Sequence, residues 1–357
     1  MEPDVRAVRP NEALEWPRLV AWLRERLPAC DIPGLDVSRE PDVAQFPGGH
    51  SNLTYLIRFG GADIVVRRPP FGPLPPTAHD MAREYRWLAA MHRVFPLAPR
   101  PYLLCEDPAV IGSVFYAMER RRGLVVRAQE PPQLADKPDA RRALSAAMID
   151  TLADLHAIDV AQVGLAGLGK PAGFVDRQVR GWTERWHRSK TTTLVEMDGL
   201  AEWLRAHMPP EPAAPSVVHG DFKVDNVMLD PANVGRIVAV FDWEMSALGD
   251  PLVDLGIVLA YWEPTAPESQ RDALTTVTHR PGYFTRDEII ERNGRRSGRS
   301  LSNIRFYEIF AVFKIAVVIQ QIYFRYVSGQ TTDPRFASFD ARVEYLARHA
   351  AALAETA

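Results

Sequence analysis

The sequence predicts an α+β protein in which a small antiparallel sheet precedes a larger, mostly helical region. The sheet follows from residues 53–59, which alternate in character, and from a Gly-Gly turn that leads into 64–68, an apolar triplet followed by two arginines. Residues 43–46 add a strand before a Gly-containing loop, so we expect a three-stranded antiparallel sheet. The helical region follows from residues 140–158, where apolar side chains recur at helical spacing.

The alternation typical of strands and the spacing typical of helices also predict the other elements. Residues 113–118 are expected to form an apolar strand. Asp139 is expected to cap the helix at 140–158, and Thr285 is expected to cap a helix at 287–293. Further helices are expected at residues 17–27, 78–94, 174–190, 306–324 and 341–353.

Composition limits the classes of protein to which the chain can belong. Its 357 residues are 46% apolar and 24% charged, enough for two lobes with separate cores. The net charge of -3 lacks the basicity expected of a nucleic-acid-binding protein. Cys30 and Cys105 offer neither a disulfide framework nor paired zinc spacing, which favours a cytoplasmic location.

Two segments bear on membrane association. The first 26 residues contain acids and arginines throughout, without the apolar segment of a signal peptide. The most apolar long segment, 306–324, is interrupted by Glu308, Lys314 and two glutamines, which favours a buried helix over a membrane span. No membrane partner is therefore expected.

The most informative stretch is Val217–Glu244. Its apolar runs at 227–229 and 237–241 are separated by a turn-rich segment and predict a hairpin. Asn226 and Asp242 then flank the open end of this hairpin. Mg²⁺ prefers oxygen ligands from one or two such side chains together with phosphate oxygens, so this end is a candidate metal site.

The residue order in this stretch is H-G-D-x-x-x-x-N followed by F-D-W-E. It resembles the catalytic loop and metal-binding acid of the protein-kinase-like phosphotransferases. Gly220 replaces the arginine of protein kinases, and Trp243 and Glu244 replace their Phe-Gly. In these respects the chain is similar to the aminoglycoside phosphotransferase family of small-molecule kinases.

The resemblance implies a bilobal, protein-kinase-like fold with a small antiparallel-sheet N-lobe and a larger, mostly helical C-lobe. Residues 1–118 would form the N-lobe, 119–124 the hinge, and 125–357 the C-lobe with its acceptor-side insertions. Only a short loop separates Asp242 from the helix that contains Asp254. A regulated protein kinase needs a longer activation segment, so that class is disfavoured.

The resemblance also assigns roles in the C-lobe. Asp221 would orient an acceptor hydroxyl and accept its proton, and Asn226 and Asp242 would hold Mg²⁺. Glu244 would bind a second ion or only its water shell. Lys223 would touch the γ-phosphate, although a solvated lysine is an equal alternative.

Other C-lobe residues are expected to support the site or to contact the acceptor. His219 would brace the catalytic loop, and Asp254 would support that loop through backbone hydrogen bonds. The acceptor candidates are Arg180, Trp182 and Trp186 on helix 174–190, whose aromatic residues are alternatively part of the core.

The nucleotide-binding residues implied by the resemblance are Gly48, Gly49, Ser51 and Asn52 in the first loop, Val65 and Arg67 on the third strand, Glu84 on the following helix, and Met118, Glu119 and Arg120 at the hinge. By itself the Gly-Gly of that loop is more typical of a simple turn. Strand alternation places Val65 and Arg67 on one face and Arg68 on the other.

Arg67 stands where most relatives have lysine, and a guanidinium can keep the phosphate role with a different reach. Glu84 is expected to pair with Arg67, the alternative being an exposed helix acid. The arginine run 120–122 is either solvated or attracts phosphate or CoA. The Arg-Arg-Pro-Pro context of Arg67 is similar to the branch of the family found fused to acyl-CoA dehydrogenases.

Together these features predict an ATP- or GTP-dependent kinase that phosphorylates a hydroxyl of a small molecule, with Mg²⁺ as cofactor. A hydroxyacyl-CoA or another hydroxylated metabolite is the acceptor that the resemblance suggests. The alternatives are a catalytically inactive nucleotide-binding regulator and an aminoglycoside-modifying kinase.

Overall fold

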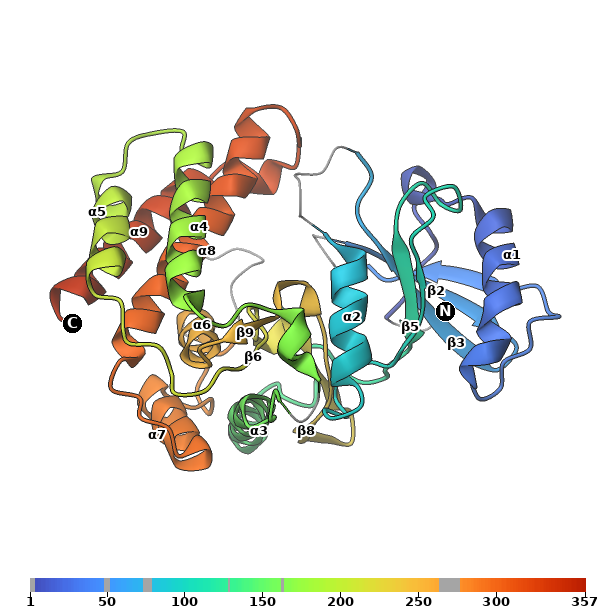
Figure 1. The fold of residues 1–357 in the computed structure, drawn as a ribbon, viewed down its shortest axis with the longest axis horizontal. Coiled ribbons are helices and arrows are strands. Elements are labelled where there is room, and N and C mark those ends of the chain that lie inside the picture. The colour runs from blue at the N-terminus through green and yellow to red at the C-terminus, as the bar shows by residue number, and fades with distance from the viewer. Residues whose placement is uncertain (1–3, 48–51, 73–78, 128, 162–163, 263–276) are drawn as a thin grey trace. The chain divides into compact units, whose positions relative to one another are not determined.

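The computed structural model describes residues 4–47, 52–72, 79–127, 129–161, 164–262 and 277–357. The chain divides into two compact units, which are described separately (Figure 1). The first unit comprises residues 1–122 and 239–244, and the second comprises 123–238 and 245–357. The return of 239–244 to the first unit was not predicted.

The first unit is built on a five-stranded antiparallel sheet in the order β1-β2-β3-β5-β4. Its strands are β1 (Asp42–Gln45), β2 (Leu53–Phe59), β3 (Ala62–Arg68), β4 (Pro101–Cys105) and β5 (Phe115–Glu119). The three predicted N-terminal strands and the later strand at 113–118 are confirmed. The expectation of a three-stranded sheet was wrong, because β5 pairs with β3 and the short, unpredicted β4 pairs with β5.

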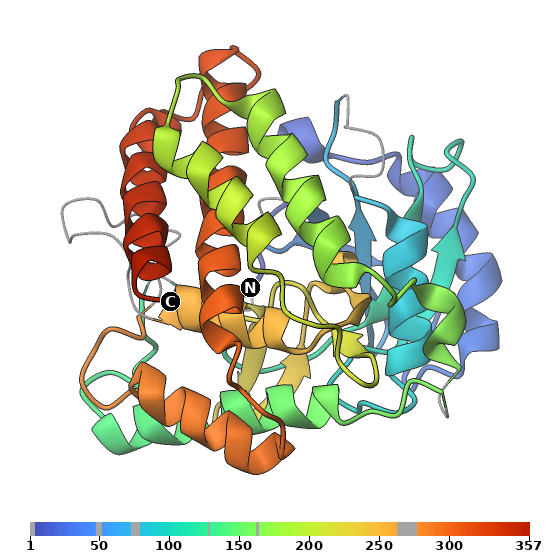
Figure 2. The same ribbon diagram turned by 60° about the vertical axis from the view of Figure 1, so that its left-hand side comes forward.

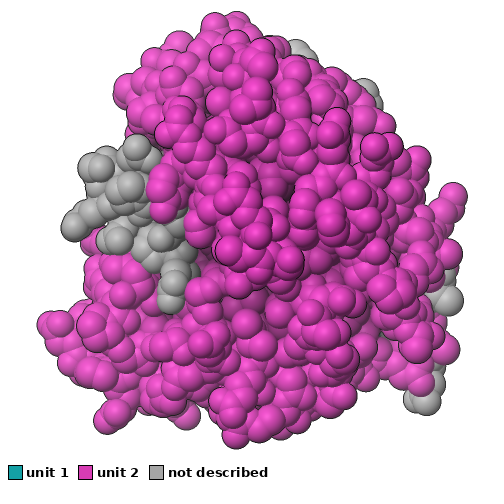
Figure 3. All heavy atoms as spheres, turned by 90° about the vertical axis from the view of Figure 1, so that its left-hand side faces the viewer, with its two compact units in different colours: residues 1–122, 239–244 teal, residues 123–238, 245–357 magenta. Residues whose placement is uncertain are grey.

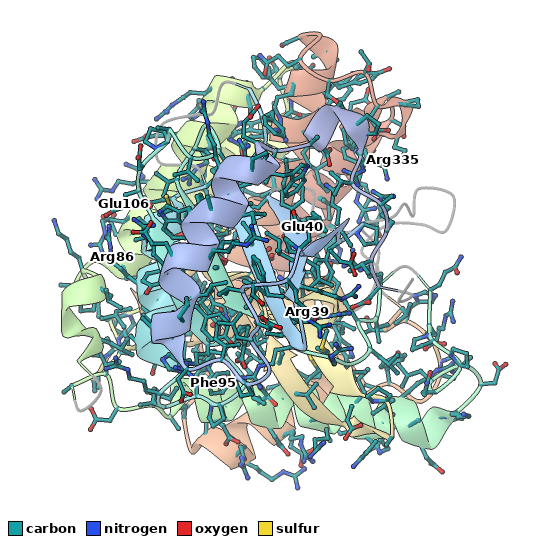
Figure 4. The ribbon with its side chains drawn as sticks, turned by 90° about the vertical axis from the view of Figure 1, so that its right-hand side faces the viewer. Arg39, Glu40, Arg86, Phe95, Glu106 and Arg335 are labelled. Carbon is teal, nitrogen blue, oxygen red and sulfur yellow. The ribbon has the colours of Figure 1, made fainter. Side chains whose placement is uncertain are left out.

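One face of this sheet is covered by helix α1 (Trp16–Arg26), which crosses the strands in Figure 4. Leu19 and Leu23 of α1 pack in one apolar cluster with Tyr55 and Ile64 of the sheet. Each fully buried side chain of this kind contributes about 1.5–3 kcal/mol. The amphipathic pattern of the helix therefore explains its position.

The other face of the sheet carries α2 (Met81–Met91). Asp80 caps this helix by accepting a hydrogen bond from the backbone N–H of Arg83 at 2.9 Å. Tyr85 of α2 makes an edge contact with Tyr116 of β5, with ring centroids 6.4 Å apart. The two faces of the sheet thus have separate helical partners.

The second unit contains seven of the described α-helices. They are α3 (Pro138–His156), α4 (Phe174–Ser189), α5 (Val195–Ala206), α6 (Leu252–Trp262), α7 (Arg286–Ser297), α8 (Ile304–Val327) and α9 (Phe339–Glu355). The 3-10 turns within the described residues of both units are η1 (Pro10–Glu12), η2 (Leu27–Cys30), η3 (Leu165–Leu168), η4 (Val224–Asn226), η5 (Trp243–Met245) and η7 (Pro334–Phe336). Figure 3 shows this unit from the side where α5 and α9 lie.

Helix α8 is the centre of the second unit. It contacts α4, α5, α6 and α9, and Figures 1 and 2 show α4 and α9 alongside it. By length and composition it is a candidate membrane span, but 78% of its apolar 18-residue segment is buried inside the protein. The predicted buried helix is confirmed, and polar residues such as Lys314 lie within it.

Two predicted helix caps had different outcomes. Thr285 forms a full capping box with Glu288 at the start of α7, as expected from its sequence. Asp139 is not a cap, because α3 begins one residue earlier at Pro138 and its N-cap is Lys137. Asp139 instead lies in the first turn, where an acid is favoured by the helix dipole.

The predicted hairpin is formed by β7 (Val227–Asp230) and β8 (Asn233–Val240). Its turn is shorter than expected, and the carboxylate of Asp230 accepts a hydrogen bond from the backbone N–H of Ala232 at 2.8 Å. Before it, β6 (Ser216–Val218) pairs antiparallel with β9 (Ala247–Gly249). Strand β6 leads directly into the segment that carries the predicted catalytic acid.

Candidate active site

Residues 219–226, the predicted catalytic loop, are fixed at their start by a buried acid of α6. The backbone N–H groups of His219 and Gly220 each donate to the carboxylate of Asp254 at 2.7 Å. His156 Nε2 lies 3.0 Å from the same carboxylate. Burial raises the pKa of Asp254, but hydrogen bonds from His156 and His219 outweigh burial and lower the pKa overall. The backbone support expected of Asp254 is present.

A buried lysine of α8 holds the same loop through its carbonyl. Lys314 Nζ donates to the carbonyl oxygen of Gly220 at 2.5 Å, and it lies 5.4 Å from the ring centroid of Trp182. Burial lowers the pKa of Lys314 to about 8, while Asp221 and Asp254 oppose that shift. An anion and a cation therefore hold opposite polar groups of one short backbone segment.

Gly220 is required by the geometry of the loop. Its φ is +83°, and a Cβ added there would lie 2.7 Å from the carbonyl oxygen of Met245. No residue with a Cβ fits such an approach without moving the backbone. The close approach of Met245 therefore explains why this chain has glycine where protein kinases have arginine.

The predicted base and one predicted metal ligand are in direct contact. Asn226 Nδ2 donates both to the backbone carbonyl of Asp221, at 2.8 Å, and to its carboxylate Oδ2, at 2.9 Å. The backbone N–H of Asp221 donates to His219 Nδ1 at 3.2 Å, consistent with a bracing histidine. The loop thus fixes the Asp221 carboxylate through its own neighbours.

Lys223 pairs with the Asp221 carboxylate. Its Nζ lies 2.9 Å from Asp221 Oδ2 and 5.1 Å from the ring centroid of Tyr261 on α6. Burial lowers the pKa of Lys223, but Asp221, Tyr261 and Asp225 outweigh burial and raise it well above its ordinary value. Lys223 is therefore a permanent cation beside the predicted base, and not a freely solvated side chain.

In the first unit, Arg67 bridges two acids. Its Nε lies 3.2 Å from Glu84 Oε2, and its Nη2 donates to Asp242 Oδ1 at 2.6 Å. The expected Arg67–Glu84 pairing is present, although the first contact lacks hydrogen-bond alignment. Burial raises the pKa of Glu84 to about 7, with Arg67 acting in the opposite direction.

The strand register groups other predicted nucleotide-binding residues. Val65 pairs directly with Met118, and Arg67 pairs with Tyr116 across β3 and β5. Directly opposed residues share a face of a sheet, so these four lie together on the α2 side. Arg68 points to the other face, where it donates to the carbonyl of Ile111 at 3.1 Å, as alternation predicts.

The returning segment 239–244 is held by side chains of the first unit. Arg83 Nη1 donates to the carbonyl of Glu244 at 2.6 Å, and Asn52 Nδ2 donates to its carboxylate at 3.0 Å. Asp242 has a φ of +66°, a left-handed conformation that is uncommon outside glycine. These contacts and Arg67 compensate for the unfavourable backbone at Asp242.

The hinge arginines are neutralised by acids of the first unit. Arg120 pairs with Asp4 at 2.8 Å and with Asp63 at 3.0 Å, and Arg122 also pairs with Asp63. Arg121 pairs with Glu119 at 2.6 Å. These pairs argue against the alternative in which the arginine run attracts phosphate or CoA.

Gly48, Gly49 and Ser51, three of the predicted loop residues, lie outside the described residues. The predicted acceptor residues are described, and their positions differ. Trp186 is fully buried and donates through Nε1 to Asp198 at 2.9 Å, so it is a packing residue. Trp182 is 4% exposed and contacts Lys314.

Arg180 lies on a different face of α4 from Trp182, because two residues span about 200° of a helix. It pairs with Asp176 at 2.7 Å and is 63% exposed. It lines an open cavity of about 540 Å³ between α4 and α5. The cavity is bordered by Asp176, Val179, Arg180, Thr183, Glu184, His187, Asp198, Ala201, Glu202, Arg205 and Met208. The acceptor role expected of Arg180 therefore does not follow from its position.

Each predicted metal ligand, taken within its own unit, offers an oxygen donor of the kind that Mg²⁺ prefers. Asn226 uses its amide nitrogen in both hydrogen bonds to Asp221, so its oxygen is the atom left for a cation. Asp242 supplies a carboxylate, of which Arg67 engages one oxygen. Within the described residues there is no cluster of three or more His, Cys, Asp or Glu side chains suited to a metal. One such oxygen donor from each residue is consistent with Mg²⁺, which keeps waters and phosphate oxygens as further ligands.

Three contacts were not predicted from the sequence. They involve Lys314 at the Gly220 carbonyl, Tyr261 beside Lys223, and Arg83 at Glu244. The lysine had a visible signal, since a charged residue inside an apolar helix needs a buried partner. Tyr261 and Arg83 carry no comparable signal in the sequence.

Comparison with known sequences identifies the family. The profile of the phosphotransferase enzyme family matches residues 42–289. Rat acyl-CoA dehydrogenase family member 11 is 33% identical over 334 residues, covering 92% of this chain and 42% of that protein. The probable acyl-CoA dehydrogenase IBR3 of Arabidopsis thaliana is 31% identical over 308 residues, covering 81% of this chain and 37% of that protein. The chain therefore spans less than half the length of these relatives.

Solved structures agree with this assignment. A Ralstonia eutropha protein described as a candidate aminoglycoside phosphotransferase has a TM-score of 0.80 and 31% identity, with 96% of this chain and 99% of that chain covered. Spectinomycin phosphotransferase APH(9)-Ia, with ADP and spectinomycin, has a TM-score of 0.60 and 11% identity, over 97% and 99% of the two chains. The chain belongs to the aminoglycoside phosphotransferase-like family of phosphotransferases and has its kinase-like fold.

Proposed function

We propose that the protein is an ATP- or GTP-dependent kinase that transfers the γ-phosphate to a hydroxyl group of a small molecule. The observation that carries this proposal is the contact of Asp221 with Asn226 in a loop held by Asp254. Phosphoryl transfer relies on positioning and on charge neutralisation, and a fixed carboxylate beside a cation ligand supplies both requirements.

In this mechanism Asp221 receives the proton of the acceptor hydroxyl. Asn226 and Lys223 both engage Oδ2, so Oδ1 is assigned as the accepting oxygen. The acceptor oxygen forms a bond to the γ-phosphorus, and the bond from that phosphorus to the β–γ bridging oxygen breaks. Lys223 remains charged and attracts the transferred phosphoryl group.

Mg²⁺ would be held by Asn226 and Asp242, and when bound it neutralises charge on the β- and γ-phosphates. Glu244 would hold a second ion or its waters. Val65, Arg67 and the hinge residues Met118, Glu119 and Arg120 would bind the nucleotide. ATP as co-substrate is supported by a fold relative, APH(4)-Ia, solved with AMP-PNP and hygromycin B, at a TM-score of 0.56 and 16% identity.

The acceptor is proposed to be a hydroxyacyl-CoA or another hydroxylated metabolite of the cytoplasm. This choice rests on the relatives, which are named acyl-CoA dehydrogenase family members and of which this chain covers only a part. Fold alone does not identify a substrate. The acceptor therefore has to be found by direct assay.

The test is Mg²⁺-dependent nucleotide consumption with a panel of hydroxyacyl-CoAs, other hydroxylated metabolites and aminoglycosides. We expect one acceptor class to stimulate turnover, and Asp221→Asn to reduce kcat by about 100-fold or more while nucleotide still binds. Asp230→Asn is the matched control, because it makes the same change in the turn of the adjacent hairpin. Nucleotide binding without stimulation by any acceptor would favour an inactive regulator.

A further inference from the structure

Lys314 is a buried cation that the sequence did not assign to the site. It lies on α8, 94 positions along the chain from Gly220, and its ammonium group contacts the carbonyl immediately before Asp221. The Lys314 residue is only 7% exposed. Keeping a lysine in such a position is costly unless its charge is compensated, and a methionine would fill similar space more cheaply.

The backbone N–H and carbonyl groups of Gly220 are held by side chains of opposite charge. The N–H donates to Asp254, and the carbonyl accepts from Lys314. Gly220 has a φ of +83°, and this backbone conformation limits the other hydrogen-bond partners that its N–H and carbonyl groups could reach. The Gly220 carbonyl is part of the peptide that joins Gly220 to Asp221, so removing Lys314 would let that peptide rotate, and the direction of the Asp221 side chain depends on that rotation.

We propose that Lys314 is a positioning residue for phosphoryl transfer, which orients the catalytic aspartate Asp221 by holding the Gly220 carbonyl and by placing a positive charge behind the loop. The proposal rests on the proposed function for its effect on turnover. The effect on the loop itself does not depend on any acceptor.

The charge of Lys314 also predicts a pH dependence. Charged groups that interact with it are Asp221 and Lys223 of the loop, Asp254 of α6 and Arg185 of α4. Its pKa is lowered to about 8, so the charged form is lost as the pH rises through that value. Turnover should decline above pH 8 for this reason.

The test compares Lys314→Met, Lys314→Gln and Lys314→Arg with wild type. We expect the methionine variant to lower kcat by about 10- to 100-fold, with the nucleotide KM unchanged, because only the orientation of the base is lost. The glutamine variant retains a hydrogen-bond donor without the charge and should lie between wild type and methionine. The arginine variant should retain most activity and lose the decline near pH 8.

Hydrogen–deuterium exchange of the peptide covering 217–223 provides the second readout. Exchange there should increase in Lys314→Met and not in Gln320→Met, a matched change on α8. Gln320 is also buried and donates to a backbone carbonyl, that of Ser189, at 2.8 Å. This comparison separates an effect on the loop from a general loosening of the helix.

Several results would overturn the proposal. These are a kcat of the methionine variant within about twofold of wild type, loop exchange equal to that of Gln320→Met, or the same pH profile in wild type and Lys314→Arg. If the methionine variant does not fold, the glutamine and arginine variants decide by the same readouts. If no acceptor stimulates wild type, the proposed function fails, and exchange alone decides the role of Lys314.

Discussion

The two units hold their key acids in different ways. In the second unit, Asp221 belongs to a loop whose backbone is bound to a buried carboxylate and a buried ammonium group. In the first unit, Asp242 is held through its side chain by Arg67, and its φ is in the left-handed region. Backbone anchors resist exchange with solvent or ligand, whereas an arginine on a carboxylate can be replaced by another cation. The comparison indicates that the predicted base, Asp221, is pre-organised and that the predicted metal ligand, Asp242, is adjustable.

The largest effect should come from Asp254→Asn, which breaks the backbone anchor in the second unit. The N–H groups of His219 and Gly220 donate to different oxygens of Asp254, so the substitution leaves one of them facing an NH₂ group and the other facing an uncharged oxygen. We expect a loss of about 3–5 kcal/mol in the free energy of unfolding, because buried donors lose their charged partner. We also expect a fall in kcat of about 100-fold, since Asp221 loses its fixed direction. Urea unfolding and steady-state kinetics measure the two effects.

Asp250→Asn is the control for this prediction. Asp250 is also buried and bonds Tyr307 at 2.5 Å and the N–H of Leu252 at 2.9 Å, without holding the loop. It should lose stability and keep its kcat. Equal kcat losses in the two variants would show that the anchor has no specific role.

Asp254 also predicts how the free energy of unfolding depends on pH in the acid range. Its pKa in the folded protein lies below the ordinary value of 3.8, so the folded state binds fewer protons than the unfolded state near that pH. Its stabilisation is therefore present above about pH 3.8 and is lost as the pH falls below it. Asp254→Asn should remove this part of the acid dependence.

An intermediate effect should come from Arg67→Lys in the first unit. Lysine has one nitrogen and cannot contact both Glu84 and Asp242 as the guanidinium does. We expect Mg·nucleotide to bind about tenfold more weakly, the equivalent of one charge-assisted hydrogen bond. Isothermal titration calorimetry gives the Kd. Arg68→Lys, on the opposite face of the same strand, should leave the Kd unchanged, and equal effects would contradict the pairing argument.

The smallest effect should come from Glu244→Gln, which weakens the contact with Asn52 and retains the carbonyl that Arg83 binds. We expect the nucleotide KM to rise about two- to fivefold, because one partly buried charge-assisted hydrogen bond is weakened. Glu12→Gln is the matched control, since Glu12 accepts from the amide of Gln45 elsewhere in this unit. A loss of kcat above tenfold would instead indicate that Glu244 is an essential metal ligand.

Much of the local structure could be predicted from the sequence. Alternation in 53–59 predicted β2 and placed Arg67 and Arg68 on opposite faces, because strand side chains alternate regardless of context. The Thr285 capping box and the buried α8 also followed from local patterns. The cap assigned to Asp139 failed because Pro138 is itself a favoured first helical residue.

Part of the candidate site could also be predicted, because some of its residues are close together in the sequence. The residue order placed Asp221 and Asn226 in one loop, and the structure brings the two side chains into contact. The predicted acceptor residues on α4 were less certain from the sequence, since helical spacing does not show whether an aromatic side chain packs in the core or lines a binding site. Trp186 illustrates this limit, because its burial depends on packing against elements remote in sequence.

By itself, the sequence determined the family, the position of the predicted catalytic loop and the period of each long element, because these depend on residue order and on neighbours along the chain. Only the tertiary structure decided that β4 and β5 complete the sheet, that 239–244 returns to the first unit, and that Lys314 contacts the Gly220 carbonyl. Contacts such as Lys314 to Gly220 join positions 94 residues apart, and their energy depends on distance and burial that no local pattern encodes.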